Sequence, residues 1–169
     1  KATNTEVLSI EFPRDTKGWG GHGNYIVIGG NDVSDVRHAI ELGLELTKKN
    51  AGELYISDSG HLEFTFSASA GAALQKAFHA VPGEAFGFMA GSPAAIVLVM
   101  ADTAMKASAV SITCYMTPSI GTSHSNEVIL GISGDASAVK AAVLEARQVG
   151  LELLIGMGSY PEIPGVPYL

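Results

Sequence analysis

The stretch SPAAIVLVMADTAMKASAVSITCY, residues 92–115, predicts a helix that leads directly into a strand. We expect the helix over Pro93–Ala107, because an alanine-rich run favours a helix and proline is tolerated in its first turn, where no N–H is needed. The β-branched residues of Val110–Met116 then favour a strand. This strand pattern recurs at the start of the chain, where KATNTEVLSI (1–10) parallels KASAVSITCY (106–115).

The recurrence belongs to a longer internal repeat, in which each copy reads as strand, loop, strand and helix. The second halves of the two copies are HGNYIVIGGNDVSDVRHAIELGLEL (22–46) and HSNEVILGISGDASAVKAAVLEARQ (124–148). The expected strands are Thr5–Phe12, Tyr25–Gly29, Val110–Met116 and Glu127–Ser133. The expected helix N-caps are Asp32 or Ser34 and Asp135 or Ser137. Apolar helix faces are expected from Val36, Ile40 and Leu44, and from Val139, Val143 and Ala146.

Further elements are expected between the two copies: strands at 52–58, 61–69 and Ala85–Ala90, and a helix near Ala70–Phe78. Leu62 and Phe64 alternate with Glu63, which is the period of a strand with one face towards solvent. Because strands and helices alternate through short links, we expect an α/β or α+β fold with helices on the faces of its sheets.

The composition indicates an oligomer. The chain has 169 residues, of which 47% are hydrophobic and only 16% are charged. Its longest strongly apolar run, Ala94–Ala101, is far shorter than the ~20 residues that a membrane-spanning helix needs. We therefore expect the excess apolar surface to be buried between protein copies. The net charge of −7 and the scattered lysines and arginines argue against a nucleic-acid partner.

Residues that often carry chemistry form no catalytic arrangement in this sequence. The glycine-rich GWGGHGN (18–24) precedes a strand, whereas phosphate-binding loops open helices. SDSGH (57–61) has the composition of a turn and cannot supply the geometry of a catalytic triad. The single cysteine, Cys114, is expected to be a buried strand thiol. We therefore predict no enzyme activity and no cofactor.

The five histidines, at positions 22, 38, 61, 79 and 124, lack the spacings typical of metal motifs, so no metal site is predicted. His22 and His124 occupy equivalent loops of the two copies. We expect them to be polar lining of a shared aperture, and zinc binding or general-base catalysis remains the alternative.

Two motifs resemble the bacterial microcompartment (BMC) shell module. AFGFMAGSPAAIVLVMADTAMKASAVSI (85–112) is similar to that module's strand, helix, A-D-x-x-x-K-A and strand. SGDASAVKAAVLEAR (133–147) is similar to its second-helix signature, GD-x-x-AV-x-A-A. The loops IEFPRDTKGWGGHGN and GTSHSNEVI narrow the resemblance to tandem-module, circularly permuted shell proteins of the PduB and EtuB group.

The resemblance implies an α+β fold of two permuted modules, each with a ferredoxin-like sheet covered by helices. Residues 1–50 would form an incomplete first module, 51–160 the second module, and 161–169, with three prolines, an irregular tail. Lys1 matches the lysine that ends the first module's helix. We therefore expect Lys1 to be a truncation point, with the N-terminal part of the first module missing.

The resemblance also implies a non-catalytic, trimeric and pseudohexameric tile of a microcompartment shell. Such a tile would pass small neutral metabolites of 1,2-propanediol or ethanol utilisation. Its partners would be other copies in a homotrimer, other shell proteins and encapsulated enzymes, with no nucleic acid and no membrane. The alternative is a regulatory oligomer in which duplicated ferredoxin-like domains bind a small molecule.

Two sets of site residues follow from the resemblance. Lys106 and its copy Lys1 match the lysine at the tile edge, and Asp102 lies four residues before Lys106, where the two can pair on one helix face. A solvated lysine at a helix C-terminus is the alternative. The expected pore loops, for which ordinary hairpin turns are the alternative, are His124, Ser125 and Asn126 and their equivalents His22, Gly23 and Asn24.

Overall fold

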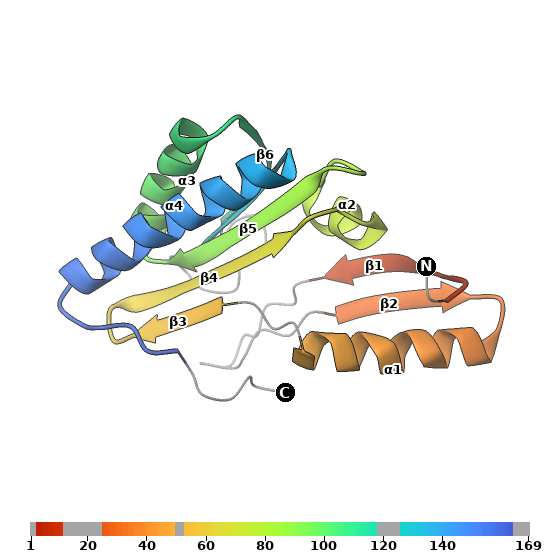
Figure 1. Ribbon diagram of the computed structural model, residues 1–169. Helices are drawn as coiled ribbons and strands as arrows, with labels where there is room; N and C mark the ends of the chain where they lie inside the picture. Colours follow the sequence, from red (N-terminus) through yellow and green to blue (C-terminus); the bar gives the residue numbers. More distant parts are fainter. Residues whose placement is uncertain (1–2, 12–24, 50–52, 118–125, 164–169) are drawn as a thin grey trace.

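Two antiparallel sheets and four helices make up the part of the chain that the computed structural model describes, which is residues 3–11, 25–49, 53–117 and 126–163 (Figure 1). The strands are β1 (Thr5–Glu11), β2 (Tyr25–Gly30), β3 (Glu53–Ser57), β4 (Gly60–Ser67), β5 (Ala85–Ser92), β6 (Val110–Met116) and β7 (Val128–Gly134). The helices are α1 (Val33–Lys49), α2 (Ala72–Phe78), α3 (Ala94–Ala107) and α4 (Ala136–Gly156). The fold class is therefore α+β, as predicted.

The larger sheet has the strand order β3-β4-β5-β7-β6, and all neighbouring strands are antiparallel. Helices α3 and α4 lie side by side on one face of this sheet (Figure 1). The main core fills the space between these helices and the sheet. Its fully buried side chains include Leu62, Met89, Met100, Leu130 and Ile132.

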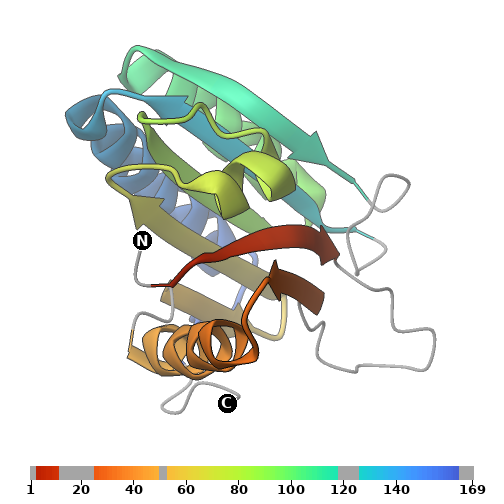
Figure 2. The same cartoon turned by 90° about the vertical axis from the view of Figure 1, so that its right-hand side faces the viewer.

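The opposite face of the large sheet carries a second, smaller core under the short helix α2. Phe78 of α2 stacks on Phe86 with ring centroids 5.6 Å apart and meets Phe88 edge-on at 5.4 Å. Strand β1 passes beside α2 (Figure 2), where Lys76 Nζ donates to the Leu8 carbonyl oxygen at 3.4 Å. Helix α2 thus connects the two sheets.

The two repeat copies differ in how far their helices are buried. Helix α4 packs against α3 and the large sheet, and its Val139 and Val143 are buried as predicted. Helix α1 lies against β1 and β2 (Figure 1) and contains no buried residue. The side chains of Ile40 and Leu44, expected on its packed face, are about half exposed, at 49% and 53%.

Helix starts differ slightly from the prediction. Pro93 precedes α3 as its N-cap, with an extended backbone (φ −71°, ψ 151°), instead of lying in the first turn. Asp32 is the residue that caps α1, because its Oδ1 accepts a hydrogen bond from the Ser34 N–H at 2.7 Å. The side-chain and backbone bonds from Ser34 hold the pKa of Asp32 below its usual value. Asp135 occupies the N-cap position of α4.

One ion pair ties the edge strand β3 to α4. Arg147 Nη1 donates to both carboxylate oxygens of Glu53, at 2.8 and 2.7 Å. These bonds hold the pKa of the Glu53 carboxyl below its ordinary value, so the pair's contribution is lost as pH falls through that lowered pKa. Both side chains are partly exposed, so we expect a contribution of about 1 kcal/mol or less.

Candidate functional site

The predicted tile-edge residues lie on the exposed side of α3. Lys106 Nζ is 2.6 Å from Asp102 Oδ2, in the expected pairing of residues four apart. Their side chains are 74% and 63% exposed. Both groups are therefore available to a neighbouring molecule while remaining oriented by each other. Lys1 lies outside the described residues.

Of the six predicted pore residues, the structure describes Asn126. His22, Gly23, Asn24, His124 and Ser125 lie outside the described residues. Asn126 Oδ1 accepts a hydrogen bond from the Ala94 N–H, the first of α3, at 3.3 Å. Pro93, the N-cap residue of α3, has no side-chain acceptor, so Asn126 satisfies an N–H group that the helix itself leaves unpaired.

This contact makes Asn126 a capping residue for α3. Asn126→Ala is expected to lower the free energy of unfolding by about 0.5–2 kcal/mol, the usual cost of losing a capping acceptor. Asn126→Asp keeps an acceptor and adds a charge favoured at a helix N-terminus, so it should cost less. Urea denaturation of both variants measures the difference. If the wild type and Asn126→Ala are equally stable, the Asn126 side chain does not stabilise α3 as a cap.

A second polar group lies on the large sheet, on the face opposite α3 and α4. His61 Nε2 is 3.1 Å from Glu127 Oε1, and one potential ligand atom from each of His61, Glu63 and Glu127 lies within 4.8 Å of the others. The side chains of His61 and Glu127 are 17% and 8% exposed. Spacing rules missed this group because Glu127 is 66 residues from His61. The available signal was the H-L-E at 61–63, which places two polar side chains on one strand face.

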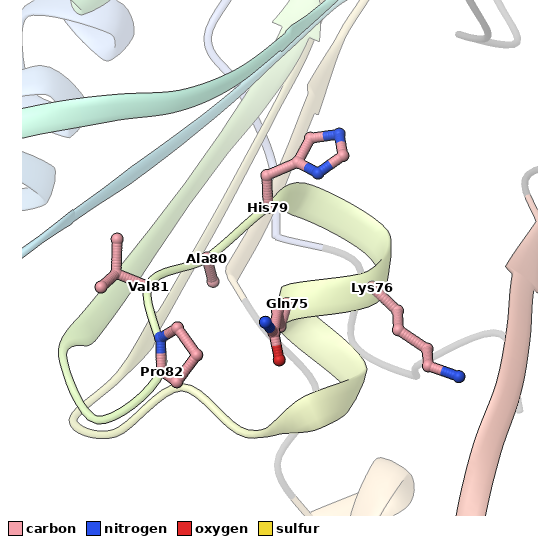
Figure 3. Close-up of a pocket in the computed structure, with 6 residues that line it drawn as sticks. All are labelled: Gln75, Lys76, His79, Ala80, Val81 and Pro82. Atoms are coloured by element: carbon pink, nitrogen blue, oxygen red, sulfur yellow. The ribbon is translucent and has the colours of Figure 1, made fainter.

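The pocket drawn in Figure 3 is an open depression of about 560 Å³ beside α2. It is lined by Gln75, Lys76, His79, Ala80, Val81 and Pro82. The Lys76 side chain extends towards β1 and away from Pro82 (Figure 3). The polar groups therefore do not converge on one point, as they would in a small-molecule site.

Cys114 is buried in β6, as predicted from the sequence. Burial raises the pKa of its thiol to about 11. A backbone hydrogen bond from Gly131 favours the thiolate, but its effect on the pKa is smaller than that of burial. The group therefore stays protonated at neutral pH and is a poor nucleophile. In the described part of the chain, no helix is long and apolar enough to span a membrane.

A family model described as the BMC domain matches residues 85–161. This range begins at β5 and ends just beyond α4. It contains the motifs from which the resemblance was inferred.

Sequence relatives extend the match over nearly the whole chain. The chain is 51% identical over 162 residues to the bacterial microcompartment shell protein PduB of Citrobacter freundii, covering 96% of this chain and 60% of that protein. It is 47% identical over 161 residues to PduB of Limosilactobacillus reuteri, covering 95% of this chain and 68% of that protein. The chain thus spans 60% of the length of the first of these relatives.

Solved structures agree with the sequence relatives. A trimeric bacterial microcompartment shell protein PduB matches with a TM-score of 0.88 and 45% identity, over 99% of this chain and 74% of that one. EtuB from Clostridium kluyveri matches with a TM-score of 0.88 and 44% identity, over 99% of this chain and 73% of that one. The chain therefore belongs to the family of bacterial microcompartment shell proteins, in the group of PduB and EtuB.

Proposed function

We propose that this chain is a structural, non-catalytic subunit of a bacterial microcompartment shell and forms a trimeric, pseudohexameric tile. The observation that carries the proposal is the match to the trimeric PduB shell protein over 99% of this chain. The internal repeat adds support, because two similar modules per chain turn three copies into six quasi-equivalent units.

We infer that residues 1–50 belong to the first module, 51–160 to the second, and 161–169 to a tail. The repetition of β1, β2 and α1 by β6, β7 and α4 supports this division. The exposed apolar side chains of α1 support burial of the first module against further protein.

The proposal assigns the exposed Lys106 to contacts between neighbouring tiles. Lys106→Glu should weaken the formation of two-dimensional arrays, as imaged by electron microscopy, because the reversed charge would be repelled by the group of the neighbouring tile that accepts the lysine cation. The change should lower the free energy of unfolding by about 1–2 kcal/mol, because it replaces the exposed pair with Asp102 by two like charges and puts a negative charge at a helix C-terminus. Arrays of the unaltered protein should also weaken with rising salt.

Lys140→Glu is the matched control, because it makes the same charge change on the exposed side of another helix, α4. If Lys106→Glu forms arrays as readily as this control does, Lys106 does not take part in the contact between tiles. A protein that never forms arrays, and instead stays a discrete oligomer stabilised by an effector, would favour the regulatory alternative.

The proposal includes passage of small neutral metabolites, such as diols or alcohols, past the loops that precede β2 and β7. These loops offer polar groups without fixed charge, which can replace water contacts without holding a solute tightly. The residues concerned are His22, Gly23, Asn24, His124, Ser125 and Asn126. Other shell proteins and the enclosed enzymes are the expected partners.

Replacing both Gly23 and Ser125 with leucine should narrow the passage and lower metabolite flux into intact compartments. Asn126 is unsuitable for this test because its side chain caps α3. The measurement is the consumption of external substrate by purified compartments, with shell assembly checked by electron microscopy. Unchanged flux through normally assembled shells would show that metabolites do not pass by these loops.

A further inference from the structure

His61, Glu63 and Glu127 are brought together by strand pairing rather than by sequence. His61 and Glu63 are two residues apart on β4, so they project from the same face, while Leu62 between them is fully buried in the main core. Strand β5 separates β4 from β7, and its Gly91 pairs with both Leu62 and Val128. Glu127, which directly precedes Val128, therefore lies across β5 from His61.

The backbone around this cluster is fixed on both sides. Asn126, next to Glu127, is bonded to the first N–H of α3, and Val128 joins the ladder of β7. On the other side, Gly91 lies so close to β4 that an added Cβ would be 2.6 Å from the His61 carbonyl oxygen. His61 and Glu63 are thus held by β4, and Glu127 lies between the Asn126 contact and the first residue of β7, which favours a preformed site over one that must be assembled.

The donor set suits a divalent transition metal. One imidazole nitrogen and two carboxylates are ligands used for Zn²⁺, Fe²⁺ and Mn²⁺, and Zn²⁺ binds such a set more tightly than Fe²⁺ or Mn²⁺. Bonds of about 2.0–2.2 Å to a common ion place ligand atoms roughly 3–3.5 Å apart. The 3.1 Å between His61 Nε2 and Glu127 Oε1 already fits, and the third donor lies within 4.8 Å.

The charges of the cluster also favour a divalent metal ion. Glu127 is nearly completely buried, at 6% exposure, and a second carboxylate, that of Glu63, lies close to it. A cation that approaches the cluster is attracted by both carboxylates, one buried and one half-buried. The net charge of −7 adds a general attraction for cations.

We propose that His61, Glu63 and Glu127 bind one divalent transition-metal ion, with Zn²⁺ the preferred probe, and that the ion cross-links β4 to β7 across β5. Three protein ligands leave at least one coordination position for water or a solute oxygen. The site lies beside Asn126, at the start of β7. The proposal stands independently of the role in a shell, because it concerns a single chain.

The test is isothermal titration of the complete protein with ZnCl₂ at neutral pH in a buffer that does not bind zinc. We expect saturable binding of one ion per site and a melting temperature that rises with zinc concentration. Glu63→Gln and His61→Ala should each weaken binding at least tenfold. His79→Ala, which removes a histidine beside α2, is the matched control and should bind zinc like the wild type.

Glu63→Gln is the decisive variant, since the side chain keeps its shape and is only half-buried, so the fold should survive. Circular dichroism confirms that each variant is folded before titration. Absence of saturable binding by the wild type would overturn the site. The site would also be overturned if folded Glu63→Gln and His61→Ala bound zinc with the same affinity as His79→Ala.

Discussion

Gly60→Ala is expected to destabilise the fold by about 2–6 kcal/mol, the sum of an overpacking cost of about 1–3 kcal/mol and a similar cost for backbone strain. Gly60 opens β4 with a φ of +156°, which side-chain-bearing residues rarely adopt. A Cβ at this position would lie 1.9 Å from the carbonyl oxygen of Ser92 and 2.8 Å from its carbonyl carbon. These are backbone atoms of β5, so neither can rotate away.

Urea denaturation of Gly60→Ala measures this cost, and Gly156→Ala is the matched control. Gly156 ends α4, and a Cβ there would meet nothing within 4 Å. The control should therefore be neutral, or more stable by up to about 1 kcal/mol, because alanine loses less backbone entropy on folding. A Gly60→Ala protein as stable as this control would show that β4 and β5 approach each other less closely than described.

Leu62→Ala is expected to cost about 2–5 kcal/mol, as deletion of a fully buried leucine side chain does when a cavity remains. Leu62 has no exposed surface and lies where β4, β5 and α4 meet. A Cβ added to Gly91 of β5 or Gly150 of α4 would come within 2.7 or 3.2 Å of its methyl groups. Because these two neighbours are glycines, neither has a side chain that could move in to fill the cavity.

Thermal and urea unfolding of Leu62→Ala measure the loss, and Leu62→Met separates volume from chemistry. Methionine nearly conserves the volume, so that variant should lose less than about 1.5 kcal/mol. Equal losses in the two variants would show that the shape of leucine, and not the cavity, dominates at this position.

Local sequence patterns predicted the elements of the fold well. The bounds of β6 match the prediction, β7 begins and ends one residue later than predicted, and β2 begins at the predicted residue but ends one residue later. These strands were predictable because β-branched runs favour strands. The start of α3 was displaced because Pro93 takes an extended conformation just before the helix. An amphipathic pattern does not show what covers it, which explains why the burial of Ile40 and Leu44 was overestimated.

The site residues likewise divide into those that a local sequence pattern could predict and those that it could not. The pair Asp102 and Lys106 depends on helical spacing within one element, so the sequence predicted its contact. The approach of His61 to Glu127 depends on the strand order β4-β5-β7, which no local pattern contains. The cap that Asn126 provides to α3 likewise joins residues 32 positions apart.

The proposal that this protein is a trimeric shell tile is tested most directly by its mass in solution. Sedimentation equilibrium of the complete gene product, over a tenfold range of micromolar concentration, should give a single species of three chains that persists on dilution. A stable monomer or dimer across the same range would show that the protein does not form the tile proposed for it.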